Sequence, residues 1–180
     1  MQNKQELITY IAEGNKVKYL FFWGHTAKDP TSVGKECLSQ WYEVVFEINK
    51  IKYPSTEHYM MAEKARLFND NEALEKILVS THPGDAKKLG RTVKNYHDEV
   101  WKQHRFDIVV RANQAKFSQH EKLRTFLINT SDRVLVEASP RDRIWGIGMG
   151  ASNPDVENPA KWRGLNLLGF ALMATRDQMN

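Results

Sequence analysis

Glu57 and Lys64, within the segment TEHYMMAEKARLF at residues 56–68, are the first residues whose types and spacing could do chemistry. On a helix, Lys64 lies inside an apolar stripe of methionine, leucine and phenylalanine side chains, and Glu57 lies on the same face two turns earlier. Two interpretations remain open. Lys64 either keeps a solvated head on a buried stem, or it is a pocket-lining amine of lowered pKa that acts as a base or nucleophile.

A second pair of acidic residues, Glu137 and Asp142, lies in the segment EASPRDRIWGIG at residues 137–148. A buried Val-Leu-Val strand precedes Glu137, which therefore stands at a carboxyl end of a strand, where ligand sites are common. Trp145 offers a flat ring and Gly146 permits close backbone approach. A turn anchored by a buried tryptophan is the alternative. Because two carboxylates in one turn have little packing value, we expect both to face a pocket.

Asn166 is the third unusual residue, in the segment NPAKWRGLNLLGFALMATR at residues 158–176. Helical spacing places its amide on an otherwise apolar face, and a buried amide needs hydrogen-bond partners. It is expected to hold either a loop or a ligand.

The elements that must position these residues form an α+β fold that is mainly α-helical, with a short β-rich N-terminal part in the first 53 residues. Ser55 or Thr56 is expected to cap the helix that carries Glu57. Strands are expected within residues 17–23, 41–48 and 51–53, with a turn at 49–50 and a central strand at 133–137. Helices are expected at 56–68, 71–80, 86–91, 98–116, 121–128 and 162–176, with a loop at 26–35 and a break at 81–84.

Length and composition predict one domain over residues 1–180, in a cytoplasmic protein. Cys37 is the only cysteine, the first six residues lack the basic start and apolar core expected of a signal peptide, and no apolar run approaches the roughly 20 residues of a membrane helix. The net charge of +4 suggests an anionic partner, and a phosphate-bearing small molecule fits as well as nucleic acid. The six histidines lack metal-ligand spacing and no glycine-rich nucleotide motif is present, so we expect no metal and no cofactor.

Five motifs together, PSTEHYMMAEKA, GDAKKLGR, AKFSQHEKLRTFL, VEASPRDRIWGIG and WRGLNLLGFALMATR, resemble the YbiA-like group of the NADAR superfamily. The resemblance covers about residues 19–176. It implies a compact, mainly helical N-glycosidase fold that acts on ribosylated bases. One branch hydrolyses ribosylamino-pyrimidine phosphates of riboflavin biosynthesis and releases ribose 5-phosphate, and another removes ADP-ribose from guanine bases. The short single-domain length and the WGIG spelling are closer to the YbiA-like branch, and we expect the riboflavin intermediates as substrates.

Cleavage of a ribosyl C1′–N bond builds positive charge on the sugar, which a carboxylate stabilises, and the departing base needs a proton. A lysine can instead trap a ring-opened C1′ as a Schiff base. The expected catalytic residues are therefore Lys64, Glu57, Glu137 and Asp142. The expected substrate-binding residues are Trp23, His58, Arg91, Trp145, Gly146, Arg163 and Asn166, with Arg91 or Arg163 (or Arg141) on a phosphate and the tryptophans on the base.

Two further classes of protein remain open. A non-catalytic ADP-ribose or nucleotide reader would keep the same residues and release no base. A nucleic-acid binder would show an affinity that falls steeply with salt, although no basic stripe interleaved with aromatics is evident. Nucleic acid is otherwise expected only as an ADP-ribosylated substrate, and no membrane partner is expected.

Overall fold

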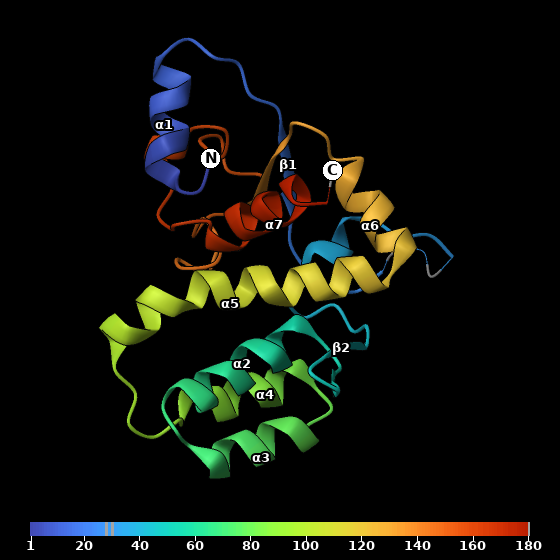
Figure 1. Ribbon diagram of the computed structural model, residues 1–180. Coiled ribbons are helices and arrows are strands. Elements are labelled where there is room, and N and C mark those ends of the chain that lie inside the picture. The colour runs from blue at the N-terminus through green and yellow to red at the C-terminus, as the bar shows by residue number, and fades with distance from the viewer. Residues whose placement is uncertain (28, 30, 180) are drawn as a thin grey trace. The chain divides into compact units, whose positions relative to one another are not determined.

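The computed structural model describes residues 1–27, 29 and 31–179, and these form a mainly helical chain with two small sheets (Figure 1). The expected α+β, mainly helical fold is confirmed. The α-helices are α1 (Lys4–Ala12), α2 (Thr56–Leu67), α3 (Asn71–Val79), α4 (Pro83–Arg91), α5 (Asp98–Gln119), α6 (Glu121–Ile128) and α7 (Leu167–Asp177). The strands are β1 (Tyr19–Phe22), β2 (Phe46–Ile48), β3 (Ile51–Tyr53) and β4 (Val134–Glu137), and short 3₁₀ turns cover Lys35–Leu38 and Pro159–Lys161.

The chain divides into two compact units. The first unit comprises Met1–Ser39 and Lys122–Asn180, and the second unit comprises Gln40–Glu121. The single domain expected over residues 1–180 stays a prediction. None of the described helices is long and apolar enough to cross a membrane.

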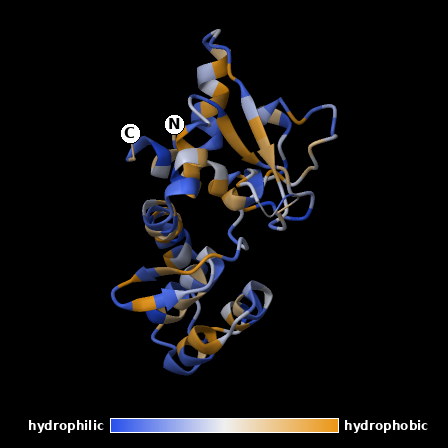
Figure 2. Cartoon of the chain, turned by 90° about the vertical axis from the view of Figure 1, so that its right-hand side faces the viewer, coloured by the Kyte–Doolittle hydropathy of each residue, from blue (hydrophilic) through white to orange (hydrophobic). Residues whose placement is uncertain are grey.

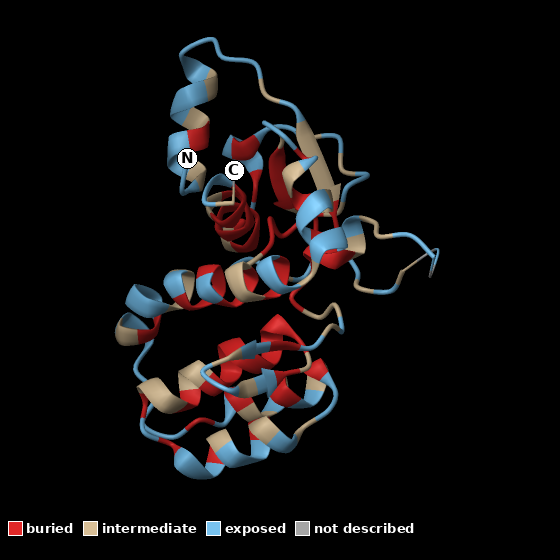
Figure 3. Ribbon diagram, turned by 45° about the vertical axis from the view of Figure 1, so that its right-hand side comes forward, coloured by how far each residue is buried: buried red, intermediate tan, exposed pale blue. Residues whose placement is uncertain are grey.

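In the first unit, β1 and β4 pair in parallel, with Tyr19 opposite Val134 and Phe22 opposite Glu137. Both strands consist largely of hydrophobic residues (Figure 2), and Val134, Leu135 and Val136 are fully or almost fully buried. Helix α7 packs directly on β4, and most of its residues are buried (Figure 3). A Cβ added at Gly169 would overlap the Leu135 carbonyl, so glycine permits the close helix–strand approach.

In the second unit, α2 packs against α3, α4 and α5, and a β2–β3 hairpin precedes it. Asn49 and Lys50 both adopt positive φ, 53° and 65°, which confirms the predicted turn between the strands. The predicted helix at 56–68 is also confirmed, with Ser55 as its N-cap. A Cβ at Gly90 would overlap the Met61 side chain, so α4 crosses α2 at its glycine.

Several expected boundaries are wrong for identifiable reasons. Helix α1 was not expected in the β-rich part, although Asn3 caps it by accepting a hydrogen bond from the Glu6 N–H. The helix predicted from residue 162 begins only at Leu167, because Asn166 adopts a left-handed conformation with φ of 55°. Helix α4 begins at Pro83 rather than at residue 86, because the His82 ring accepts from the Gly84 N–H and proline suits the first helical position.

Two predicted strands differ from the observed ones, and one predicted loop is described only in part. The strand expected at 41–48 is reduced to Phe46–Ile48. Strand β4 was expected to be central, but its sheet has two strands only in the described part of the chain. The loop predicted at 26–35 includes Lys28 and Pro30, which lie outside the described residues.

Candidate active site

Glu137 stands at the carboxyl end of β4, as predicted, next to the end of β1. Its register partner is Phe22, and the Ala138 N–H donates to the Phe22 carbonyl over 2.9 Å. Because the two strands are parallel, Trp23 and Glu137 leave the sheet at the same edge. The Trp23 side chain is 60% exposed, so its ring is available for stacking.

Asn166 uses its side chain to hold the main chain of β4. Its Nδ2 donates to the Leu135 carbonyl over 2.9 Å, and its Oδ1 accepts from the Glu137 N–H over 3.0 Å. The side chain is fully buried. Of the two roles left open for this amide, these contacts support holding a chain segment, and a ligand contact of Asn166 stays a prediction.

Asp142 has a structural use that the sequence reasoning underestimated. Its Oδ1 accepts from the N–H groups of Ile144 and Trp145 over 2.8 and 2.7 Å, so the carboxylate closes the turn that follows it. The expectation that the carboxylates of this turn have little packing value is therefore wrong for Asp142, because its side chain supports the loop. A catalytic role for Asp142 stays a prediction.

Gly146 lies in the tightest part of the same turn. A Cβ added there would come within 2.9 Å of the Glu137 carbonyl, which also accepts from the Ile147 N–H over 3.0 Å. The Gly146 carbonyl in turn accepts from the Asn166 N–H over 3.1 Å. Gly146 is therefore required by contacts within the protein, and Trp145 beside it is half-buried.

Glu57 occupies the first turn of α2 in the second unit, and its side chain is buried, with 3% exposure. The Gln40 carbonyl accepts from the Glu57 N–H and from the Thr56 hydroxyl, both over 3.0 Å, which fixes this helix end. Glu57 is thus a buried acidic group in the first turn of α2.

Lys116 is a residue that the sequence reasoning missed. It is fully buried on α5, with its Nζ 5.4 Å from the centre of the Tyr42 ring. One turn earlier on the same helix, the Asn113 amide donates to the Gln40 side chain over 3.2 Å, so these residues gather near the start of α2. The signal was present in the sequence, because Lys116 continues the apolar stripe of Val109 and Ala112, as Lys64 does in α2.

The amine of Lys64 lies between the main-chain carbonyl of Gly90 and the rings of Tyr96 and Trp101. Its Nζ donates to the Gly90 carbonyl over 2.7 Å and lies 4.3 Å from the centre of the Tyr96 ring and 5.7 Å from that of Trp101. Burial lowers the pKa of Lys64 below its ordinary 10.5. The sign of the pKa shift of Lys64, which the sequence left open, is therefore downward, and its cause is burial.

His58 is buried behind the start of α2, and its Nδ1 lies 2.8 Å from the Ser55 hydroxyl. Burial lowers the pKa of His58 below its ordinary value and so favours the neutral ring. The expected substrate contact of this ring stays a prediction.

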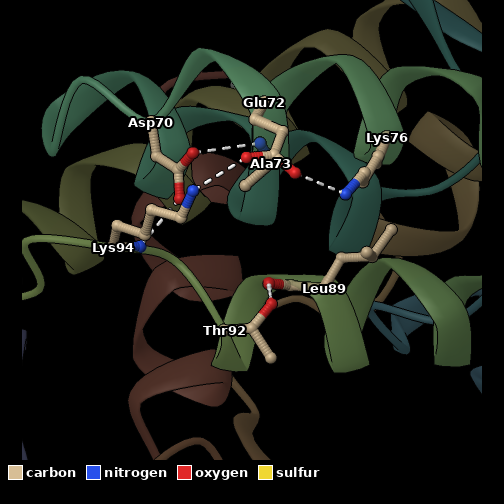
Figure 4. Close-up of polar contacts among 7 residues, drawn as sticks. All are labelled: Asp70, Glu72, Ala73, Lys76, Leu89, Thr92 and Lys94. Atoms are coloured by element: carbon tan, nitrogen blue, oxygen red, sulfur yellow. Dashed lines mark hydrogen bonds and ion pairs between the residues drawn. The ribbon is translucent and has the colours of Figure 1, made fainter.

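Arg91 lies exposed at the last position of α4, whose end is well fixed (Figure 4). The Thr92 hydroxyl donates to the Leu89 carbonyl over 2.9 Å. Further along, Asp70 accepts from the Lys94 N–H, and the Lys94 amine pairs with Glu72 over 2.8 Å. These contacts anchor the segment after Arg91 and leave its guanidinium on the surface.

The expected site residues thus fall into two groups. The first unit holds Trp23, Glu137, Asp142, Trp145, Gly146, Arg163 and Asn166, whereas the second unit holds Glu57, His58, Lys64 and Arg91. In the described ranges, no group of three or more His, Cys, Asp or Glu side chains has the arrangement needed to hold a metal ion.

Comparison with known proteins decides the family. The NADAR domain model matches residues 21–180. An N-glycosidase of Acanthamoeba polyphaga mimivirus is 41% identical over 166 residues, which cover 89% of this chain and 96% of that protein. The chain belongs to the NADAR family.

Two further relatives extend this result. N-glycosidase YbiA of Escherichia coli is 32% identical over 127 residues, which cover 71% of each chain. The NMR structure of E. coli YbiA superposes with a TM-score of 0.72 at 26% identity, covering 91% of this chain and 86% of that one. The chloroplastic riboflavin biosynthesis protein PYRR of Zea mays is 32% identical over 134 residues, 71% of this chain and 20% of that protein. The predicted YbiA-like resemblance is confirmed, and every candidate residue of this NADAR chain lies inside the matched region.

Proposed function

We propose that this chain hydrolyses the C1′–N bond of ribosylated bases, and that its substrates are ribosylamino-pyrimidine phosphates of riboflavin biosynthesis, from which it releases ribose 5-phosphate. The coarser part follows from family membership: the chain is a hydrolase acting on N-glycosyl bonds, and its substrate is a small ribosylated base. The riboflavin part is supported by the name of the maize relative.

The observation that carries the proposal is the buried carboxylate of Glu57 at the start of α2. Breaking the C1′–N bond builds positive charge at C1′ and O4′, and a carboxylate placed beside the sugar stabilises that charge. Glu137 is the second candidate for this task, because the Asn166 side chain fixes its main chain. Either carboxylate, once protonated, can also supply a proton to the departing base.

A lysine amine supports a second form of the same reaction. If the ribose ring opens, the neutral amine attacks C1′, the base leaves with a proton, and the resulting imine is hydrolysed by water to free sugar and free lysine. Lys64 suits this role because burial lowers its pKa and so raises the fraction of neutral amine. Lys116 is the alternative amine, since it is fully buried.

The same chemistry serves a substrate in which ADP-ribose is attached to guanine, because both substrates present a ribose on an aminated heterocycle. The test therefore incubates the purified protein with a ribosylamino-pyrimidine phosphate and with ADP-ribosylated guanosine, and measures released base by liquid chromatography. We expect release from the pyrimidine substrate. Release from the guanosine substrate alone would exchange the substrate class, and binding of both without release would make the chain a non-catalytic reader.

The assay gains a matched control from α3. Glu57→Gln keeps the side-chain shape and removes the charge, and it is expected to lower turnover by at least about a hundredfold. Glu75→Gln makes the same chemical change at an exposed position and is expected to leave turnover unchanged. Equal rates for the two variants would remove Glu57 from the mechanism.

A further inference from the structure

Arg143 and Arg163 lie side by side on the first unit, although 20 residues separate them in the chain. Gly148 sits between their stems: a Cβ added there would come within 3.1 Å of Arg143 Cγ and 2.9 Å of Arg163 Cβ. Gly148 has a φ of 68° and its N–H donates to the Asp142 carbonyl over 2.9 Å. Glycine therefore lets the two arginine stems approach the same point.

Main-chain hydrogen bonds fix the spacing of this pair. The Leu165 N–H donates to the Arg143 carbonyl over 3.0 Å, and the Gly164 N–H donates to the Ile147 carbonyl over 2.9 Å. A Cβ at Gly164 would overlap the Gly146 carbonyl, so the two segments are in close contact. The arginines are consequently carried by a rigid double turn, the same turn whose other end supports Glu137.

The charges of this pair have no partner within the described part of the chain. Both side chains are exposed, and neither forms any of the ion pairs or side-chain hydrogen bonds found there. The nearby basic residue Lys161, by contrast, pairs with Asp155 over 2.6 Å. Two adjacent positive charges repel each other unless an anion lies between them. Exposed Ile144 and Leu165 flank the pair, so the surface also offers apolar contact.

We propose that Arg143 and Arg163 form a binding site for a phosphoryl group, with their two guanidinium groups donating to its oxygens. Guanidinium forks match phosphate geometry better than ammonium groups do, and paired arginines can contact one phosphate from two sides. Arg163 was a candidate on sequence grounds, whereas Arg143 enters only through its position beside Gly148. The inference rests on the proposed function for the identity of the ligand, because the phosphate of a ribose 5-phosphate ester and the diphosphate of ADP-ribose share this chemistry.

The test measures binding rather than turnover. Ribose 5-phosphate, ADP-ribose and unphosphorylated ribose are titrated into the full chain by isothermal calorimetry. Arg143→Ala and Arg163→Ala are each expected to raise the Kd for phosphorylated ligands at least tenfold. The phosphorylated ligand with the larger increase identifies the source of the phosphoryl group. Lys122→Ala, an exposed charge change in the same unit, is expected to leave the Kd unchanged.

Unaltered affinity in both arginine variants would overturn the proposal, as would an equal loss in Lys122→Ala or no binding of any phosphorylated ligand by the parent. Circular dichroism melts check that the variants fold, and Arg143→Gln provides a second substitution that keeps a polar stem. The two proposals fail separately. Arginine-dependent binding without base release would contradict the glycosidase and leave this site standing, whereas base release independent of both arginines would do the reverse.

Discussion

The polar residues at the carboxyl end of β4 and those at the start of α2 serve different ends. In the first unit, the side chains of Asn166 and Asp142 form hydrogen bonds with main-chain groups. Buried Arg176 donates to the Thr130 hydroxyl and the Arg133 carbonyl. In the second unit, the buried polar side chains include Glu57 and Lys116, whose protonation can change. Asn166, Asp142 and Arg176 thus support the main chain, whereas Glu57 and Lys116 are buried ionisable groups.

This difference separates stability from turnover. Removing a side chain that satisfies buried main-chain groups leaves those groups unpaired, so the folded state loses free energy. Removing an ionisable group that acts only in the transition state lowers the rate and leaves the fold intact. Substitutions of these two kinds of side chain are therefore expected to change different observables.

The largest effect is expected at Lys64. If its amine is the nucleophile, Lys64→Ala and Lys64→Arg should each lower turnover by at least about a thousandfold, because a guanidinium stays protonated and cannot attack. Borohydride added during turnover should fix a ribosyl-derived mass, located by peptide mass spectrometry, on Lys64. Lys52→Arg, an exposed change in the same unit, serves as the control.

An adduct on Lys116 instead would transfer the nucleophile to α5. An active Lys64→Arg protein without any adduct would leave Lys64 an electrostatic role and move the chemistry to the carboxylates. The first result would place the nucleophile on α5, and the second would leave the reaction to Glu57 on α2 and Glu137 on β4.

The next largest effect is expected at Glu137. Glu137→Gln should lower kcat at least tenfold, because one lost transition-state contact corresponds to roughly 1.4 kcal/mol or more. The melting temperature should stay within a few degrees, since glutamine keeps the shape of the side chain and the Asn166 side chain contacts the main chain of residue 137. A fully active, well-folded Glu137→Gln protein would leave Glu57 as the sole candidate carboxylate.

Substitution of Asn166 should change mainly the stability of the fold, in contrast to substitution of Glu137. Asn166→Ala removes two hydrogen bonds and leaves the Leu135 carbonyl and Glu137 N–H without their partner, so we expect a loss of about 2–3 kcal/mol in the free energy of unfolding. Urea unfolding measures this loss, with Asn158→Ala, at an exposed turn, as the milder reference. Comparable stability of the two variants would contradict the framing role of Asn166.

The smallest effect concerns His58 and pH. Because burial lowers the folded-state pKa of His58 below 6.5, the unfolded chain binds its proton first as the pH falls. The stability present above pH 6.5 should therefore decline below it, and His58→Gln should flatten this decline in melts between pH 5 and 8. His104→Gln, an exposed change on α5, should not. Identical pH profiles for the parent and His58→Gln would contradict a lowered pKa of His58 in the folded protein.

Much of the secondary structure could be predicted because its causes are local. The period of apolar residues and the capping serine located α2, and the same kind of reasoning located α6 and the hairpin turn. Predictions failed where distant contacts override local preference. Asn166 takes a left-handed conformation because its side chain is hydrogen-bonded to β4, about 30 residues away in the chain. Helix α7 therefore begins only after Asn166.

The sequence by itself determined the family, the helical stripe that contains Lys64, and the place of Glu137 at the end of a buried strand, because each of these depends on residues near one another in the chain. Only the tertiary structure decided that Asn166 and Asp142 are occupied by main-chain groups, that the pKa of Lys64 is lowered, that Lys116 is fully buried and that Arg143 lies beside Arg163. The physical reason is that hydrogen-bond partners and desolvation are supplied by other segments of the chain. The type of a residue limits its possible chemical roles, and the residues packed around it determine which of these roles it can take.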